Sequence, residues 1–288
     1  MSLTRLWQTP LPHHPLSRVV LRLTRIEKPW FKNALIGSFM RGFNPVMHDA
    51  VRTDPLSYAS FNDFFTRELR ADARPLDPSP ETLVSPVDGT WAQSGRIESG
   101  RLFQAKGRYY DLSALLAGAA TDWQSSFDGG DFATIYLAPY NYHRIHLPSA
   151  GVLRDAWYVP GRLFSVNTKA SASIPGLFVR NERVVLVFDG PLGPFAVILV
   201  GALFVGSMTT IWHGDVAPRS PRETARIPAV PGSDTPVARG AEIARFNMGS
   251  TVILLYGRNR IAFDAAMQPG RTMRMGERIG RPLDVAHP

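Results

Sequence analysis

Short apolar runs separated by glycine and proline most constrain the fold of this chain. They recur from about residue 83 onward, as in Phe132–Leu137, Gly151–Leu153, Ala156–Val159 and Val252–Tyr256, and the 288 residues contain 24 glycines and 24 prolines. Runs of this length, ended by turns such as Pro160-Gly161, are typical of β-strands. The sequence therefore predicts a β-rich domain.

One uncharged stretch, from Gly190 to Trp212, could form either a membrane span or buried strands. Its apolar core, Phe195 to Met208, is too short to cross a bilayer as a helix, and glycines and prolines interrupt the stretch. Val184–Phe188, followed by Asp189-Gly190, has the pattern of a strand and a turn. We therefore expect buried strands here.

The first fifty residues have a different character. Pro15 to Lys28 predicts a helix, and Pro29 would end it and begin a second helix that carries several aromatic residues. On the first helix the apolar residues share one face and the basic residues the other: Leu16, Val19, Val20, Leu23 and Ile26 against Arg18, Arg22 and Arg25. Such helices either pack on their own domain or lie in a membrane interface. This segment alone does not distinguish between the two arrangements.

Weaker local signals complete the outline of the fold. Ser60, with Asp63 three residues later, predicts the start of a short helix that runs to about Leu69. Arg74–Pro80 is rich in proline and reads as a linker, a small helix is expected at Leu112–Ala117, and Pro218–Pro236 reads as a long exposed loop. The predicted class is α+β, with N-terminal amphipathic helices in residues 1–56 and a β-rich domain in residues 57–288.

The charge of the chain suggests an anionic partner. The formal net charge is +8 and the pI is about 10.1, which favours either a nucleic acid or a membrane surface. No nucleic-acid recognition motif is present, so we expect no nucleic-acid partner. The chain has no cysteine, which excludes disulfides, thiolate zinc sites and cysteine nucleophiles.

Three residues have the side chains of a charge-relay site: Asp88, His146 and Ser250. A serine hydroxyl becomes a good nucleophile only when a base takes its proton, and a neutral imidazole can do so near pH 7. Ser250 follows Gly249, whose missing Cβ opens backbone conformations closed to other residues. These residue types also occur together by chance, so their local contexts carry more weight.

The contexts match one family in order along the chain. Pro86–Gly89, Tyr136–Pro139, Tyr142–His146 and Met248–Thr251 together resemble the bacterial proenzyme type of phosphatidylserine decarboxylase. Further matching segments extend the resemblance over about residues 57 to 283. The family commonly has leucine where this chain has Met248, a change that nearly conserves volume.

The resemblance implies that the chain cuts itself between Gly249 and Ser250, giving a large β chain, 1–249, and a small α chain, 250–288. Asp88, His146 and Ser250 would form the charge relay for this cut, and Ser250 would become a covalent pyruvoyl group. That group would form a Schiff base with phosphatidylserine and release CO2, giving phosphatidylethanolamine. The two chains would form a heterodimer, with further dimerisation left open. The resemblance also implies a peripheral protein of the cell membrane, on its cytoplasmic face, in contact with anionic phospholipid.

The histidine pair needs separate treatment. In an extended Tyr142–Leu147 segment, His143 and His146 would point to opposite faces, whereas a bend between Pro139 and Pro148 would bring both into one site. His146 matches the relay position of the family. His143 is a candidate either for a role in decarboxylation or for a structural hydrogen bond. No third ligand of the usual kind lies near this pair, so we expect no metal site.

Three alternatives remain to be weighed. A serine hydrolase using Asp88, His146 and Ser250 would lack the usual Gly-x-Ser-x-Gly turn, because Thr251 and Val252 follow the serine. A non-enzymatic, basic membrane-surface binding protein would explain the charge alone. A pyridoxal-phosphate decarboxylase would need a Schiff-base lysine, for which Lys106 and Lys169 are available.

Overall fold

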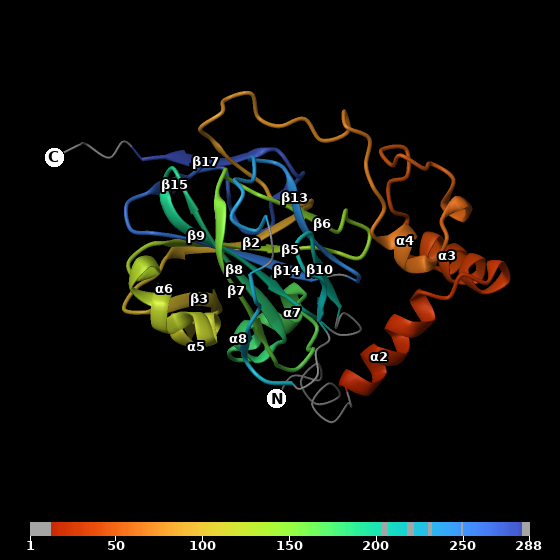
Figure 1. Cartoon of the computed structure of the whole chain (residues 1–288), viewed down its shortest axis with the longest axis horizontal. Helices are drawn as coiled ribbons and strands as arrows, with labels where there is room; N and C mark the ends of the chain where they lie inside the picture. The colour runs from red at the N-terminus through yellow and green to blue at the C-terminus, as the bar shows by residue number, and fades with distance from the viewer. Residues whose placement is uncertain (1–12, 203–206, 218–221, 230–231, 249, 284–288) are drawn as a thin grey trace.

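A central antiparallel sheet of eight strands organises the body of the protein (Figure 1). The computed structural model describes residues 13–202, 207–217, 222–229, 232–248 and 250–283. In spatial order the strands of the central sheet are β12 (Ala225–Arg226), β7 (Val152–Val159), β8 (Arg183–Gly190), β9 (Gly193–Val200), β14 (Thr251–Tyr256), β5 (Asp131–Tyr136), β2 (Gly89–Arg96) and β16 (Thr272–Met273).

Smaller sheets cover one face of the central sheet. One has four strands, in the order β11 (Gly214–Ala217), β10 (Met208–Thr210), β13 (Glu242–Phe246) and β6 (Arg144–His146). The other has three, in the order β1 (Leu83–Val84), β17 (Arg278–Pro282) and β15 (Ile261–Phe263). Residues from all three sheets, such as Val252, Ile145 and Ile279, pack in one buried cluster. This cluster is the main core of the protein.

Helices and a hairpin cover the other face (Figure 1). The hairpin is formed by β3 (Arg101–Ala105) and β4 (Arg108–Asp111), and the helical elements are α5 (Leu112–Leu116), the 3-10 turn η2 (Ala117–Ala119), α6 (Ala120–Phe127), α7 (Thr168–Ser171) and α8 (Leu177–Arg180). Leu115, Phe127 and Phe178 pack there against Ile253 and Leu255 of β14. The protein is therefore layered, with β14 buried between two hydrophobic cores, and the expected α+β class is confirmed.

The uncharged stretch from Gly190 to Trp212 forms strands, as expected. β9 lies in the central sheet between β8 and β14, and β10 follows in the four-stranded sheet, while residues 203–206 lie outside the described part of the chain. Among the described residues, no helix is both long and apolar enough to cross a membrane.

The N-terminal helices gather at one end of the body (Figure 1). They are α2 (His13–Thr24), α3 (Pro29–Phe43), the 3-10 turn η1 (Pro55–Ser57) and α4 (Phe61–Phe65). Pro29 begins α3, as the sequence predicts, while α2 ends four residues before the predicted Lys28. The Ser60 hydroxyl accepts the Asp63 amide at 3.1 Å, which confirms the cap of α4. That helix stops at Phe65, and Leu69 instead forms an isolated bridge with Ala50.

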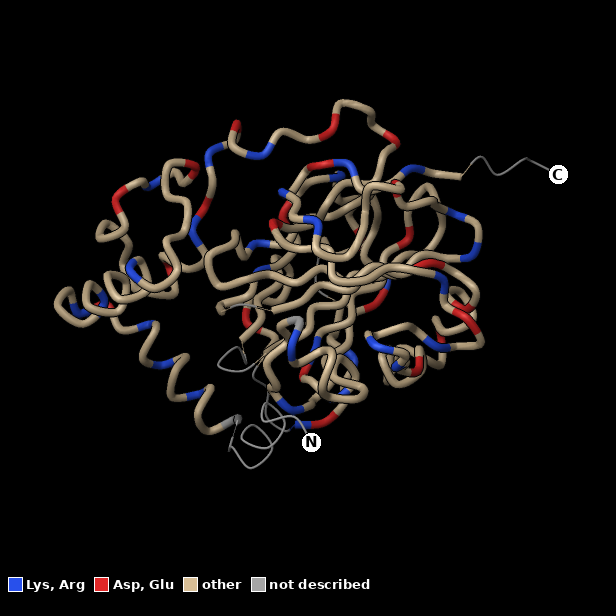
Figure 2. The backbone as a smooth tube through the Cα atoms, turned by 180° about the vertical axis from the view of Figure 1, so that it is seen from behind, with Lys and Arg blue, Asp and Glu red and all other residues tan. Residues whose placement is uncertain are grey.

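The two long N-terminal helices differ in how they are packed. Ile36 of α3 is fully buried against Phe64 and Phe65 of α4, so α3 belongs to the folded body. On α2, by contrast, Val19 is 51 % exposed and Leu23 is 40 % exposed. The apolar face predicted for this helix is therefore only partly covered by the protein itself. Basic residues recur along the length of α2 (Figure 2).

Three predicted elements have different bounds. Val152–Leu153 and Ala156–Val159 belong to one strand, β7, which has a bulge between Leu153 and Asp155, while Gly151 forms an isolated bridge with Val237. The small helix at Leu112 ends at Leu116, and the unpredicted α6 follows it. Pro218–Pro236, expected as a loop, contains the short strand β12, although residues 218–221 and 230–231 lie outside the description.

Candidate active site

Ser250 directly precedes β14, one of the two middle strands of the central sheet. β14 begins at the next residue, and the Ser250 carbonyl accepts the Leu137 amide at 2.9 Å, which extends the pairing of β14 with β5 by one step. The side chain is 1 % exposed, and its hydroxyl has no hydrogen-bond partner among the described residues. A buried hydroxyl without a partner has lost its water at a cost in free energy, which is a frequent feature of reactive sites. Gly249, expected beside it at the cut, lies outside the described residues.

The face to which Ser250 belongs follows from the strand period. Val252 and Leu254 face the core shared with β6 and β13, while Ile253 and Leu255 face the helical side. Because alternate residues of a strand share a face, Ser250 falls on the side of Val252. The four-stranded sheet that contains β6 lies on this side.

A buried amide holds the segment that leads to Ser250. Asn247 is 2 % exposed, and its side-chain nitrogen donates to Ser207 Oγ at 2.6 Å and to Thr209 Oγ1 at 3.0 Å. Its carbonyl accepts the side-chain amide of Asn62, from α4, at 3.0 Å. The segment that leads to Ser250 is thus fixed by Ser207 and β10 on one side and by α4 on the other.

The His146 ring is held through both nitrogens. Nδ1 lies 2.8 Å from the Gly240 carbonyl and Nε2 lies 3.0 Å from the Tyr142 hydroxyl. A carbonyl can only accept, so Nδ1 carries the proton of the neutral ring and Nε2 accepts from Tyr142. Burial lowers the pKa of His146 below its ordinary value, although the Gly240 carbonyl and the charge of Glu242 act in the opposite direction. The ring is therefore a neutral base whose lone pair already has a partner.

His143 has its lone pair free. Its Nδ1 donates to the Asn141 carbonyl at 2.8 Å, which leaves Nε2 as the acceptor, and Nε2 is buried with no partner among the described residues. The ring lies on Phe65 of α4, with centroids 4.1 Å apart. Burial, followed by the positive charge of Arg67, lowers the pKa of His143 to about 3. The two histidines therefore have separate sets of partners. Only His146 belongs to β6, which begins at Arg144.

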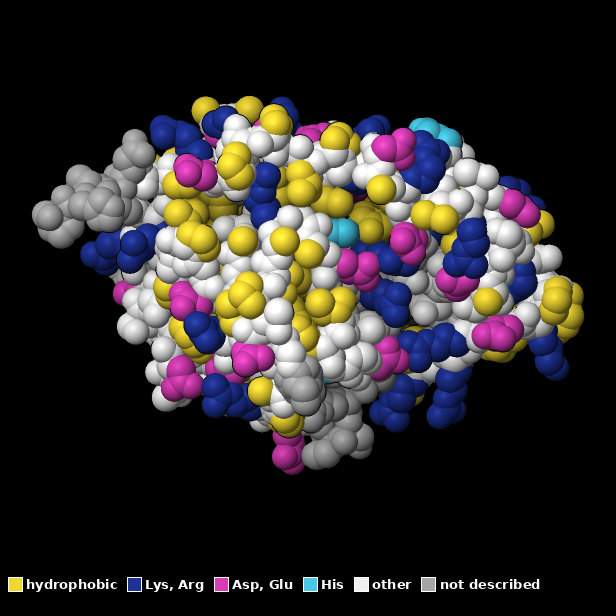
Figure 3. Space-filling view, turned by 45° about the horizontal axis from the view of Figure 1, so that its top comes forward, with side chains coloured by type: hydrophobic (Ala, Val, Ile, Leu, Met, Phe, Trp, Pro, Cys, Tyr) yellow, Lys and Arg dark blue, Asp and Glu magenta, His cyan; other side chains and the backbone are white. Residues whose placement is uncertain are grey.

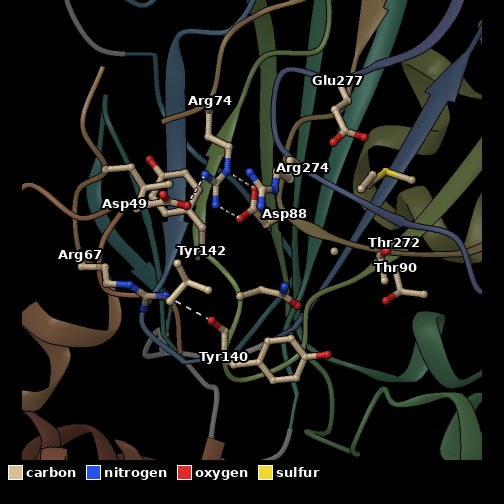
Figure 4. Close-up of a pocket in the computed structure, with 15 residues that line it drawn as sticks. Asp49, Arg67, Arg74, Asp88, Thr90, Tyr140, Tyr142, Thr272, Arg274 and Glu277 are labelled. Carbon is tan, nitrogen blue, oxygen red and sulfur yellow. Dashed lines mark hydrogen bonds and ion pairs between the residues drawn. The ribbon is translucent and has the colours of Figure 1, made fainter. Parts of the chain in front are cut away.

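Asp88 is engaged by an arginine. Arg74 Nε donates to Asp88 Oδ1 at 2.8 Å and Nη2 donates to Oδ2 at 2.6 Å (Figure 4). The Met275 amide also donates to Oδ1, at 2.8 Å. The remaining nitrogen of Arg74, Nη1, donates a hydrogen bond to Asp49 Oδ2 at 2.8 Å. Burial alone would lower the pKa of Arg74, but its bonds and charge pairing with Asp88 and Asp49 raise it above the ordinary value. Bidentate pairing of this kind fixes both the position and the charge of a carboxylate.

Asp88 and His146 are neighbours without a direct bond. The His146 amide donates to the Pro86 carbonyl at 2.8 Å, which ties β6 to the segment that carries Asp88. The ring nitrogens of His146 bond Gly240 and Tyr142, as described, and none of the described hydrogen bonds joins the ring to the Asp88 carboxylate. The influence of Asp88 is electrostatic, since its charge raises the pKa of His146 and so opposes the effect of burial.

A cavity of about 300 Å³ lies beside Asp88. Asp88, Tyr142 and three arginines, Arg67, Arg74 and Arg274, are among its lining residues (Figure 4). No local pattern in the sequence singles out these arginines, or Tyr142 as a partner of His146, because their roles depend on contacts between distant segments. The resemblance to a family, which drew attention to Tyr142–His146, was the only available signal.

The two lysines considered for pyridoxal phosphate occupy exposed positions. Lys106 lies in the turn between β3 and β4, and Lys169 lies in α7. Lys106 lines a cavity of about 230 Å³ together with Thr251, which follows Ser250. Both lysines are exposed, however, whereas His143, His146 and Ser250 are buried, so the geometry does not favour a pyridoxal-phosphate site.

Comparison with known proteins gives a consistent picture. A family profile described as "Phosphatidylserine decarboxylase" matches residues 61–281, and a second, described as "PSD", matches residues 3–44. The chain is 48 % identical over 278 residues to the "Phosphatidylserine decarboxylase proenzyme" of Azotobacter vinelandii, covering 96 % of each chain. The protein of that name from Bordetella avium is 49 % identical over 274 residues, covering 95 % of this chain and 92 % of the relative. Its counterpart in Pseudomonas fluorescens is 45 % identical over 277 residues.

Proposed function

The chain belongs to the phosphatidylserine decarboxylase family, a family of pyruvoyl-dependent carboxy-lyases, and we propose that Ser250 is the residue that becomes its pyruvoyl group. The observation that carries this assignment is the buried, unpartnered hydroxyl of Ser250 at the start of β14. The substrate is phosphatidylserine, and the products are phosphatidylethanolamine and CO2.

The first stage is self-cleavage. Ser250 Oγ attacks the carbonyl carbon of Gly249, and the acyl group moves from the nitrogen to the oxygen of Ser250. The resulting ester breaks by elimination, in which a base removes the α-proton of residue 250 and the fragment 1–249 leaves as a carboxylate. The dehydroalanine at the start of the fragment 250–288 takes up water and releases ammonia. Its three carbons remain as the pyruvoyl group.

His146 is the proposed base for this stage, with Asp88 as its acidic partner. The Nδ1–H···O=C bond to Gly240 fixes the tautomer, so that Nε2 presents the lone pair. Tyr142 now occupies that lone pair, and His146 can take the Ser250 proton only when the tyrosine hydroxyl turns away. Asp88 supports the base through its charge, which favours the protonated form of His146.

His143 is the proposed proton-transfer residue of decarboxylation. The pyruvoyl group supplies a ketone for the substrate amine and accepts the electrons released with CO2. A carbon that has lost CO2 must then gain a proton. The Nε2 of His143, which is buried against Phe65 of α4 and carries no proton in the neutral ring, can take a proton from the substrate ammonium and return it to that carbon.

Membrane association belongs to residues 1–56 in this proposal, and decarboxylation to residues 57–288. Val19 and Leu23 expose apolar surface on α2, and Trp30 at the start of α3 is 73 % exposed. Basic side chains lie along the rim of this end of the molecule (Figure 3). Apolar side chains flanked by arginines suit a peripheral position on an anionic leaflet, which we take to be the cytoplasmic face of the cell membrane.

The test of the proposed function is enzymatic. Purified protein given phosphatidylserine in mixed micelles should release CO2 and form phosphatidylethanolamine. Ser250→Ala should do neither, because no hydroxyl remains to form the pyruvoyl group. Decarboxylation by the Ser250→Ala variant would show that Ser250 is not the source of the reactive carbonyl.

A further inference from the structure

Arg67 is a buried cation whose hydrogen-bonding capacity is mostly unused. It is 3 % exposed, and one nitrogen, Nη2, donates to the Tyr140 carbonyl at 3.1 Å. The other two, Nε and Nη1, are buried without a partner among the described residues. Buried guanidinium groups are nearly always paired, because an unpaired charge away from water is costly. An arginine in this state indicates that an anion completes its surroundings.

Two carboxylates that line the cavity with Arg67 are paired with another arginine, and the third, Glu277, lies apart from Arg67 (Figure 4). Asp49 and Asp88, which line the same cavity, both form ion pairs with Arg74, and the Asp49 carboxylate also lies 3.1 Å from His48. The described ion pairs include none with Arg67. Figure 4 shows its guanidinium reaching toward Tyr140, apart from the cluster around Arg74. Its charge is therefore available to a ligand in the cavity.

The position of Arg67 connects this cavity with the proposed active site. Its bond to Tyr140 ties it to the turn that carries His143, and its charge lowers the pKa of that histidine. Arg67 follows α4, the helix whose Asn62 holds the Asn247 carbonyl ahead of Ser250. Val46, which is 46 % exposed, lines the same cavity. A lipid headgroup entering from the N-terminal helices would thus meet Arg67 close to the reacting residues.

We propose that Arg67 binds the phosphodiester of phosphatidylserine, an inference that rests on the proposed function. The planar guanidinium still has free N–H groups on Nε and Nη1, and each can donate a charge-assisted hydrogen bond to a phosphate oxygen. The substrate also has a carboxylate, but that group leaves as neutral CO2. A cation bound to the carboxylate would stabilise the substrate more than the transition state and so slow the reaction. The phosphodiester keeps its charge throughout, and binding it carries no such penalty.

The product makes the test selective, because phosphatidylethanolamine keeps the phosphodiester and lacks the carboxylate. Arg67→Met removes the charge and retains an unbranched side chain, while Arg67→Lys keeps a charge without the planar fork. Arg70→Met is the matched control, since Arg70 lies three residues away with its side chain 47 % exposed. Each variant is first analysed by gel for self-cleavage. The KM for short-chain phosphatidylserine and the inhibition constant of short-chain phosphatidylethanolamine are then measured on the cleaved protein.

Arg67→Met should raise both constants by the same factor, about 10- to 100-fold, since bonds to charged groups have this strength. Arg67→Lys should raise both by a smaller factor, which keeps the test informative if the methionine variant does not fold. Arg70→Met should leave both unchanged. A raised KM with an unchanged inhibition constant would mean that Arg67 binds the carboxylate, and this would overturn the proposal. Unchanged constants in both Arg67 variants would overturn it as well.

Failure of this inference is distinguishable from failure of the proposed function. If the wild-type protein releases no CO2 from phosphatidylserine, the function itself is wrong. If the wild-type protein is active and the Arg67 variants bind substrate and product normally, only the assignment of Arg67 is wrong.

Discussion

At the scale of single residues, the tautomers of two histidines divide the proposed chemistry. Both rings donate Nδ1–H to a backbone carbonyl, Asn141 for His143 and Gly240 for His146, so both present Nε2 as a base. They differ in what occupies that lone pair, which is Tyr142 for His146 and no described group for His143. In the proposed mechanism, the first ring acts once, in self-cleavage, and the second acts in every round of decarboxylation.

We predict separable effects of the two histidines. His146→Ala should remain a full-length precursor, because the base that activates Ser250 is gone. His143→Ala should be cut but should decarboxylate at least about 100-fold more slowly, the usual contribution of one acid–base group. Gel analysis, followed by a headgroup assay on the cut fraction, measures both steps. The reverse pattern would assign the two roles the other way round.

The buried state of His143 also predicts a pH dependence of stability. Its pKa is about 3 in the folded protein, against an ordinary value of 6.5. Below pH 6.5 the unfolded chain therefore binds a proton that the folded protein does not, and stability falls as the pH falls toward 3. Between pH 6.5 and pH 5 this one residue should cost roughly 2 kcal/mol.

Urea unfolding at the two pH values measures this effect, with Ser250→Ala as the background so that the protein is one chain. His143→Gln in that background should lose roughly 2 kcal/mol less between pH 6.5 and pH 5 than its parent. His48→Gln, at a side chain that is 80 % exposed, is the control. An identical loss in all three proteins would show that His143 is not the group that titrates.

Single residues also show where sequence-based prediction stops. The chain order of Asp88, His146 and Ser250 is visible in the sequence, and so are the motifs around them. The pairing of Asp88 with Arg74 and the use of Tyr142 as the partner of His146 are not, because such contacts depend on how distant segments meet. In a chain whose positive charge is mostly arginine, no local signal separates Arg67 from the exposed arginines.

At the scale of elements, the helix starts that depend on a local sequence signal are the ones predicted correctly. Pro29 begins α3 and Ser60 caps α4, since each works through its own backbone neighbourhood. α6 was missed because it starts at Ala120, continues from a 3-10 turn and has no side-chain cap. β7 was expected as two strands because Asp155 interrupts its apolar pattern. That residue is buried because Trp123, Trp157 and Arg226 all donate to it, and only the folded chain brings them together.

The two N-terminal helices have different consequences for a membrane experiment. Removing residues 1–50 would also remove Ile36, which is fully buried against α4, and Lys32, which donates to the Leu56 carbonyl at 2.7 Å. Such a truncation would damage the body of the protein near the site. Substitutions on α2, where the apolar face is exposed, test the anchor without this complication.

We predict that the protein binds anionic vesicles through α2. Val19→Ser combined with Leu23→Ser should weaken binding about tenfold or more, since each change removes apolar surface that would enter the interface. Binding should also fall as salt is raised. Vesicle flotation measures both effects, and Val51→Ser, at a position that is 58 % exposed outside α2, is the control. Undiminished flotation of the double variant would place the anchor elsewhere.

At the scale of the whole molecule, the position of β14 decides the fate of the two fragments. It lies between β9 and β5 in the central sheet, and all of its residues are buried. The proposed fragment 250–288 also supplies β16 to the central sheet, and its β17 pairs with β1 of the rest of the chain. The cut would therefore leave one folded particle of two chains. We expect the fragments to copurify and to separate only in denaturant.

The most direct test of the central claim is the intact mass of the purified wild-type protein under denaturing conditions. The account predicts two chains, 1–249 and 250–288, formed without added protease. The smaller should be lighter by one ammonia than a peptide that begins with an unmodified Ser250, because a ketone has replaced the amine. The Ser250→Ala variant should give one uncut chain. A wild-type protein that decarboxylates phosphatidylserine while its mass remains that of the full 288-residue chain would contradict the account.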